Sequence, residues 1–102
     1  MLEIRPNCEY CDRDLSPESL EAMICTYECT FCKTCVDEIL SNVCPNCGGG
    51  FCRRPVRPKI ARREGVGLQY QPASTTRINT QFNLREIREF SQTASDIDPE
   101  KR

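Results

Sequence analysis

Apolar residues in the first half of the chain come in short runs, so the sequence predicts short elements and few large core residues. Residues 22–27 carry Ala, Met and Ile before a cysteine and Thr-Tyr after it, a composition that favours a strand. Residues 36–42 contain neither glycine nor proline and place Val36, Ile39 and Leu40 on one helix face. We therefore expect one short strand and one short amphipathic helix.

Two further helices are indicated by capping signals. Ser16, followed by a proline and acidic residues, predicts one or two helical turns over residues 17–22. In the second half of the chain, Asn83 and Glu86 have the spacing of a capping box, which predicts a short helix at residues 83–91. Its apolar face would consist of Leu84, Ile87 and Phe90.

Composition divides the chain into three parts. Residues 1–52 hold all nine cysteines, and residues 53–63 hold six basic residues and two prolines without an acidic residue. Residues 64–102 are rich in Thr, Ser, Gln and Asn, and such a segment buries too little apolar surface to offset the entropy of ordering. The sequence predicts a cysteine-rich module, a basic linker and a tail that is mostly disordered apart from its helix.

Charge changes sign between the module and the rest of the chain. Residues 1–52 carry nine acidic and three basic side chains, a net charge of −6, whereas residues 53–102 carry eleven basic and six acidic ones, a net charge of +5. An anionic module is poorly suited to nucleic acid. Any contact with nucleic acid would come through the basic side chains of the linker, Arg53, Arg54, Arg57, Lys59, Arg62 and Arg63.

The cysteines form four closely spaced pairs. Three pairs have the spacing Cys-x-x-Cys, and the remaining pair has three intervening residues. A turn of this length aims both sulfurs at one point, and zinc takes four such ligands in a tetrahedron at about 2.3 Å. Four pairs therefore predict two Zn²⁺ ions. The expected ligands are Cys8, Cys11, Cys25, Cys29, Cys32, Cys35, Cys44 and Cys47, which leaves Cys52 as a spare structural cysteine.

Other uses of paired cysteines fit the sequence less well. The cysteine count is odd and the charged N-terminus does not resemble an export signal, which opposes a disulfide framework and predicts a cytoplasmic address. A thioredoxin-like motif would need a βαβ context. The tight run from Cys29 through Cys32 to Cys35 leaves iron–sulfur ligation open, because ferredoxins use such runs. No apolar run approaches the roughly 20 residues of a membrane helix.

Metal would also supply stability that this module lacks. A unit of roughly 50 residues with few large apolar groups is marginal on its core alone. A structural zinc contributes ~10–16 kcal/mol in finger peptides, so we expect the module to unfold without metal. The four ligands of each site leave no open position, and the chain has no histidine for acid–base work. We therefore do not expect an enzyme.

The order of the cysteines resembles a RING-type zinc domain that has cysteine at its fourth ligand position. Residues 28–36 are similar to the family's His-x-Phe-Cys-x-x-Cys-aliphatic segment, and residues 44–47 to its closing Cys-Pro-x-Cys. This resemblance implies a cross-brace, with the first and third pairs on one zinc and the second and fourth on the other. A sequential arrangement stays open from the spacing alone. The implied fold class is a small α+β zinc domain of treble-clef or RING-like type with a flexible C-terminal tail.

A second resemblance covers about residues 1–60. The segments MLEIRPNCEYCDRDL, ICTYECTFCKTCVDEIL and NVCPNCGGGF followed by RRPVRP are similar to a bacterial family of small cysteine-rich proteins of unknown function. It implies no activity. RING-type ligases carry an aliphatic residue in the first loop and a basic one after the last ligand, where this chain has Tyr10 and Gly48. Ubiquitin ligase activity is therefore not expected.

The function that these observations favour is a zinc-stabilised interaction module, acting as a protein–protein adaptor, with structural zinc. Two other classes stay open. One is a nucleic-acid-binding regulator that uses residues 53–63. The other is a zinc store or redox-responsive switch that releases metal when its thiolates are oxidised.

Overall fold

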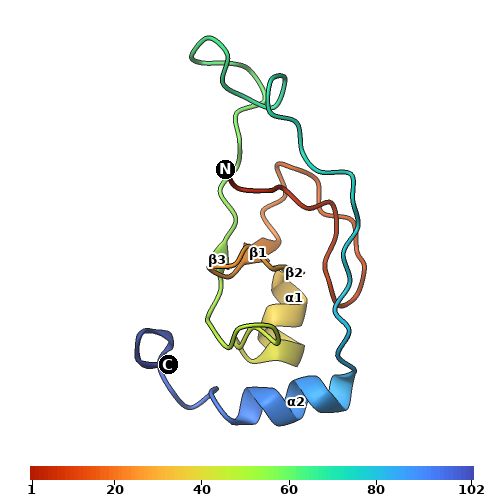
Figure 1. Cartoon of the computed structure of the whole chain (residues 1–102), viewed down its shortest axis with the longest axis vertical. Helices are drawn as coiled ribbons and strands as arrows, with labels where there is room; N and C mark the ends of the chain where they lie inside the picture. Colours follow the sequence, from red (N-terminus) through yellow and green to blue (C-terminus); the bar gives the residue numbers. More distant parts are fainter.

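The computed structural model describes all 102 residues and contains a small sheet, three helical segments and long connecting loops (Figure 1). The strands are β1 (Ala22–Ile24), β2 (Thr30–Cys32) and β3 (Cys52–Arg53). The helical segments are α1 (Lys33–Cys35) continued by the π-helical turn η1 (Val36–Leu40), α2 (Leu84–Gln92) and the 3-10 turn η2 (Pro99–Lys101). None of the helices combines the length and the apolar character needed to cross a membrane.

The strands form an antiparallel sheet with the order β2-β1-β3. The strand expected over residues 22–27 is present as β1 but ends at Ile24, because the chain turns back at Glu28, whose φ is 65°. The helix expected over residues 17–22 is wrong: turns occupy this stretch, and Ala22 pairs with Cys32 in the sheet. Pairing with β2 therefore outweighs the local capping signal.

The central helix follows directly from β2. The expectation for residues 36–42 holds in kind, but the helical segment begins earlier, at Lys33, and ends at Leu40. The two residues after Leu40 have left-handed backbone angles, with φ of 52° at Ser41 and 56° at Asn42, and these end the helix. Val36 and Leu40 are buried on its inner face.

The core consists largely of the cysteines themselves. Six of the twelve residues in the main buried cluster are cysteines, and the others are Leu15, Ala22, Phe31, Val36, Leu40 and Ile87. The largest of these, Phe31, packs edge to face against Phe51 with ring centroids 5.5 Å apart. Cysteines therefore make up half of the buried cluster, and large apolar side chains are few.

The polar tail lies along the module, although its composition predicts a mostly disordered segment (Figure 1). Its backbone hydrogen-bonds to the module, with the Thr80 N–H donating to the Glu9 carbonyl at 2.7 Å. The Arg77 guanidinium donates to the carbonyl oxygen of Asp12 and to the Asp14 carboxylate, each at 2.6 Å. Specific polar contacts thus order a segment that has few apolar residues.

Helix α2 closes the end of the module that is farther from the N-terminus (Figure 1). It has the capping box expected from the sequence: Asn83 accepts from the Glu86 N–H, and the Glu86 carboxylate accepts from the Asn83 N–H. Of its three apolar positions, only Ile87 is buried, at 1% exposure, in the core beside η1. Leu84 and Phe90 are each 40% exposed.

The segment expected as a linker contributes to the module. Arg54 is 2% exposed, and its guanidinium donates to the carbonyl oxygens of Arg5 and Ser16, both at 2.9 Å. Arg57 donates to the carbonyl oxygens of Leu2 and Gln71. These two arginines therefore join segments that are far apart in the sequence.

Candidate metal centre

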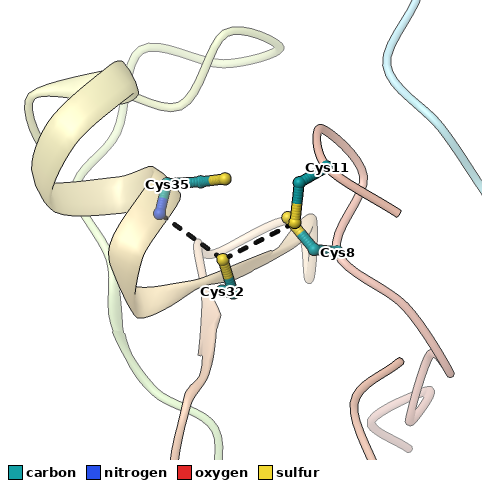
Figure 2. A group of neighbouring side chains, drawn as sticks. All are labelled: Cys8, Cys11, Cys32 and Cys35. Carbon is teal, nitrogen blue, oxygen red and sulfur yellow. Dashed lines mark hydrogen bonds between the residues drawn. The ribbon is translucent and has the colours of Figure 1, made fainter. Parts of the chain in front are cut away.

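The first cysteine cluster contains Cys8, Cys11, Cys32 and Cys35. Their four Sγ atoms all lie within 4.8 Å of one another, and those of Cys11 and Cys32 are 3.9 Å apart (Figure 2). A tetrahedron with metal–sulfur bonds of about 2.3 Å has edges of about 3.8 Å. A disulfide would need a sulfur–sulfur distance of about 2.05 Å, and all nine cysteines are free. The spacing suits a single metal ion.

Two separate parts of the chain bring this cluster together. Cys8 and Cys11 lie on the first loop, where the Asp12 N–H donates to the Cys8 carbonyl at 3.0 Å and closes the turn. Cys32 ends β2 and Cys35 ends α1, so both face the loop from the strand–helix junction (Figure 2). The strand-to-helix transition therefore presents the third cysteine pair to the first.

Hydrogen bonds and burial set the electrostatics of the first cluster. The Cys35 N–H donates to the Cys32 sulfur at 3.4 Å, which caps α1 and favours a negative sulfur. Burial raises the pKa of the Cys8 and Cys35 thiols, and neighbouring cysteines raise the pKa of Cys35 further. Partial burial also acts to raise the pKa of Cys11, but the Arg13 N–H and the adjacent thiols outweigh it and lower that pKa. Four adjacent thiolates need a cation to offset their repulsion.

The second cluster is assembled from the β1–β2 turn and the loop after η1. The sulfurs of Cys25, Cys44 and Cys47 lie within 4.8 Å of one another. Backbone N–H groups of Tyr27 and Gly49 donate to the sulfurs of Cys25 and Cys47, each at 3.4 Å. Both turns thus direct N–H groups at sulfur, an arrangement that stabilises thiolates.

Cys29 lies beside the second cluster and not within the set of sulfurs that share the 4.8 Å spacing. It is buried, and the side-chain amide of Asn46 donates to its sulfur at 3.3 Å. Burial raises the pKa of Cys29, and the thiol of Cys25 adds to this effect although the amide of Asn46 opposes it. Burial likewise raises the pKa of Cys44, with further increases from the charges of Cys25 and Cys29. Cys29 therefore lies near the second cluster but outside its set of three closely spaced sulfurs.

The clusters interleave along the chain. The first pair of cysteines groups with the third, and Cys25 of the second pair groups with the fourth. The seven clustered cysteines are compatible with the grouping that the RING resemblance implies. The run from Cys29 to Cys35 is divided, since Cys32 and Cys35 belong to the first cluster and Cys29 does not. The run therefore does not serve one centre in the manner of a ferredoxin motif.

The spare cysteine and the basic residues singled out in the sequence lie outside the two clusters. Cys52 is exposed on β3 and belongs to neither cluster. Among the cations expected to meet nucleic acid, Arg53, Lys59, Arg62 and Arg63 are exposed, whereas Arg54 is buried. Sequence reasoning missed the amide of Asn46 as a partner of sulfur, although its position between Cys44 and Cys47 was a signal. No local signal marked Arg54 as a buried residue.

Comparisons with known proteins place the chain beside cysteine-rich proteins whose activity is unknown. Residues 1–57 match the family described as "Protein of unknown function (DUF1272)". The uncharacterized protein R02474 of Rhizobium meliloti (strain 1021) is 56% identical over 78 residues, which cover 76% of this chain and 86% of that protein. Since 78 aligned residues exceed the 57 matched to the family, the similarity continues into the second half of the chain. No solved structure matches. The chain belongs to the DUF1272 family.

Proposed function

We propose that the chain is a non-catalytic interaction module whose fold is held by two structural Zn²⁺ ions. The observation that carries this proposal is the presence of two cysteine clusters, one with four sulfurs at the spacing of a single tetrahedral ion. One ion would be held by Cys8, Cys11, Cys32 and Cys35, and the other by Cys25, Cys29, Cys44 and Cys47. A treble-clef or RING-like cross-brace is the fold type that this ligand grouping supports.

The donor set favours zinc in a structural role. Tetrahedral sites with four sulfur ligands select zinc or iron–sulfur clusters, and spacing for a single ion favours zinc. Cys8, Cys32 and Cys35 are buried, so the first site would be largely closed to substrate. With four thiolates on each divalent ion, each site would also carry a net charge of about −2 and make the module more anionic. A reducing cytoplasm is the proposed location, where such thiols stay free.

A role in binding a partner is supported by the surface. Eleven large apolar side chains are at least 40% exposed on this 102-residue chain. Two of them, Phe82 and Phe90, line one open pocket together with Pro45 and Ile87. Apolar side chains gathered at one exposed place are typical of proteins that bind a partner. The proposed role is therefore that of an adaptor, with zinc holding the binding surfaces in place.

Titration of the metal-free full chain with Co²⁺ tests both the stoichiometry and the closed character of the sites. Two closed tetrathiolate sites predict a tetrahedral spectrum with strong thiolate-to-cobalt bands that saturates at two equivalents. Small anions added afterwards should leave that spectrum unchanged. A spectrum that shifts on addition of cyanide or azide would reveal an open coordination position and contradict the structural role.

A second candidate function is zinc release in response to oxidation, which we propose for the second cluster only. Each cluster has one exposed cysteine, Cys11 in the first and Cys47 in the second. Cys29, however, lies outside the set of sulfurs that share the 4.8 Å spacing, so the second cluster would hold its ion less tightly than the first. Mild oxidant with a colorimetric zinc indicator should release one equivalent well before the other. Simultaneous release of both ions would contradict a dedicated switch.

A further inference from the structure

The most protruding part of the molecule is a loop that we call the basic loop, residues 56–70. It lies at one end of the longest dimension, opposite α2, and extends beyond the sheet and α1 (Figure 1). The molecule measures 46 × 27 × 18 Å, so this loop accounts for much of its elongation. Neither the zinc sites nor the adaptor proposal assigns a role to this loop.

The basic loop is closed and internally hydrogen-bonded. Arg57 ties its base to Leu2 and Gln71 through two hydrogen bonds of 2.6 Å each. The Gln71 side chain spans the interior, accepting from the Gly67 N–H at 3.0 Å and donating to the Gly65 carbonyl at 3.0 Å. These contacts hold the loop in one conformation, so a surface that it presents is preformed.

Close backbone packing adds to this rigidity. The Leu68 N–H donates to the Pro58 carbonyl at 2.9 Å. Gly67 packs against the backbone of Pro58 and Ala61 on the other side of the loop. A Cβ at Gly67 would approach the Pro58 carbonyl oxygen to 3.1 Å, and the φ of this residue is 148°. Only glycine fits there without strain. At the tip, Arg63 and Val66 pair across a tight turn.

Cationic and aliphatic side chains are exposed together at this end of the loop. Lys59, Arg62 and Arg63 are exposed, and none takes part in the ion pairs of the structure. Between and beside them, Ile60 is 63% exposed and Val66 is 55% exposed. A single acidic residue accompanies these cations within the loop. Unpaired cations beside exposed aliphatic residues are the composition of membrane-surface segments.

We propose that the basic loop docks on an anionic lipid surface, with Ile60 and Val66 entering the headgroup region and Lys59, Arg62 and Arg63 lying against lipid phosphates. Each cation near an anionic leaflet contributes attraction, and two aliphatic side chains add apolar burial. The docking is peripheral and reversible, since no helix of the chain spans a membrane. The zinc module would then be held at the membrane by its far end.

The exposed aliphatic residues favour lipid over nucleic acid as the occupant. Both ligands offer phosphates, so cations alone do not distinguish them. Single-stranded nucleic acid would be recognised by aromatic side chains that stack bases. The loop has one aromatic residue, Tyr70 at its base beside Gln71, whereas the residues among the cations at the tip are Ile60 and Val66. The basic loop lies at the opposite end of the molecule from α2 (Figure 1), and salt screens the repulsion between the loop and the acidic module.

Co-sedimentation of the zinc-loaded full chain with vesicles tests the proposal. Vesicles of phosphatidylcholine alone are compared with vesicles in which phosphatidylglycerol replaces a third of that lipid. We expect binding only to the anionic vesicles and a marked decrease with added salt. Absence of binding to the anionic vesicles, or equal binding to both kinds, would overturn the proposal.

Paired variants separate the two contributions. The double variant Arg62→Glu/Arg63→Glu should weaken binding to anionic vesicles at least tenfold, and Ile60→Ser/Val66→Ser should weaken it several-fold. A matched control, Arg85→Glu/Arg88→Glu, changes the same charge on exposed positions of α2 and should bind like the unmodified chain. Zinc content and circular dichroism are compared among all variants, so loss of metal is distinguishable from loss of docking.

A single-stranded oligonucleotide at the same salt concentration provides the competing outcome. If the oligonucleotide binds and the vesicles do not, the loop serves nucleic acid and the lipid proposal is wrong. Vesicle binding that the Ile60→Ser/Val66→Ser variant leaves unchanged would equally overturn the insertion of aliphatic side chains. The proposal is supported if both loop variants bind the anionic vesicles more weakly and the α2 control binds them as the unmodified chain does.

Discussion

The Sγ atoms of Cys11 and Cys32 lie 3.9 Å apart although 21 positions separate these residues in the chain. Two hydrogen bonds between Glu9 and Thr30 also join the first loop to β2, of 2.9 Å through the Thr30 carbonyl and 2.6 Å through the Glu9 carboxylate. A cation bound by the four sulfurs would add a further link between the first loop and the β2–α1 junction.

Replacing a ligand of the first cluster should remove one metal ion and unfold the module. In Cys32→Ser, a buried sulfur at the end of β2 is lost, and we expect metal content to fall from two ions per chain to one or none. Cys52→Ser is the matched control, because Cys52 is exposed and outside both clusters. Metal analysis with far-ultraviolet circular dichroism measures both effects. Full metal content in Cys32→Ser would contradict the ligand assignment.

Two adjacent arginines should differ sharply in their effect on stability. Arg54→Ala leaves the carbonyl oxygens of Arg5 and Ser16 without their donors and opens a buried cavity. We expect a loss of about 2–4 kcal/mol in the free energy of unfolding of the metal-loaded chain. Arg53→Ala, at an exposed position, should change it by less than about 0.5 kcal/mol. Urea unfolding measures the free energy of unfolding of both variants. Equal losses in the two variants would contradict the buried role of Arg54.

The docking of the tail helix can be tested at two apolar positions of α2. Ile87 is buried in the core, so Ile87→Ala should destabilise the metal-loaded chain by about 2–4 kcal/mol. Leu84 lies on the same helix and is 40% exposed, so Leu84→Ala should cost less than about 1 kcal/mol. Thermal unfolding measures both. A tail that is disordered in solution would make the two substitutions indistinguishable.

Acid should release the metal. Burial raises the pKa of the Cys35 and Cys44 thiols, so the metal-free fold favours their protonated forms. Without metal, the stability that these protonated thiols contribute is present below the ordinary thiol pKa and is lost as pH rises through the raised pKa values. Zinc binding has the opposite dependence, because the ion must displace these protons. Stability of the zinc-loaded chain should therefore fall as pH decreases, as measured by urea unfolding at constant free zinc.

The sequence could predict features that depend on neighbouring residues. The capping box of Asn83 and Glu86, the strand at Ala22 and the helix near Val36 all follow from local patterns, and the structure contains each of them. Seven of the eight cysteines predicted from their spacing lie in the two clusters, and Cys29 lies outside the 4.8 Å set of the second. Local patterns thus predicted several elements and most of the clustered cysteines, although not every boundary.

Features that depend on distant partners were not predictable in this way. Nothing beside Arg54 shows that its guanidinium would meet two carbonyl oxygens 38 and 49 positions earlier. The polar composition of the tail predicted disorder. The contacts that order it could not be foreseen, because the acceptors for Arg77 lie more than 60 positions away in the first loop. The capping signal at Ser16 failed for the same reason, since sheet pairing of Ala22 with Cys32 prevails.

Native mass spectrometry of the purified full chain, before and after treatment with a chelator, tests the central claim most directly. We predict a mass that corresponds to two Zn²⁺ ions per chain, with loss of both ions and of the folded circular dichroism spectrum on chelation. A chain that is metal-free and still folded, or one that carries an iron–sulfur chromophore, would contradict the assignment of both cysteine clusters as structural zinc sites.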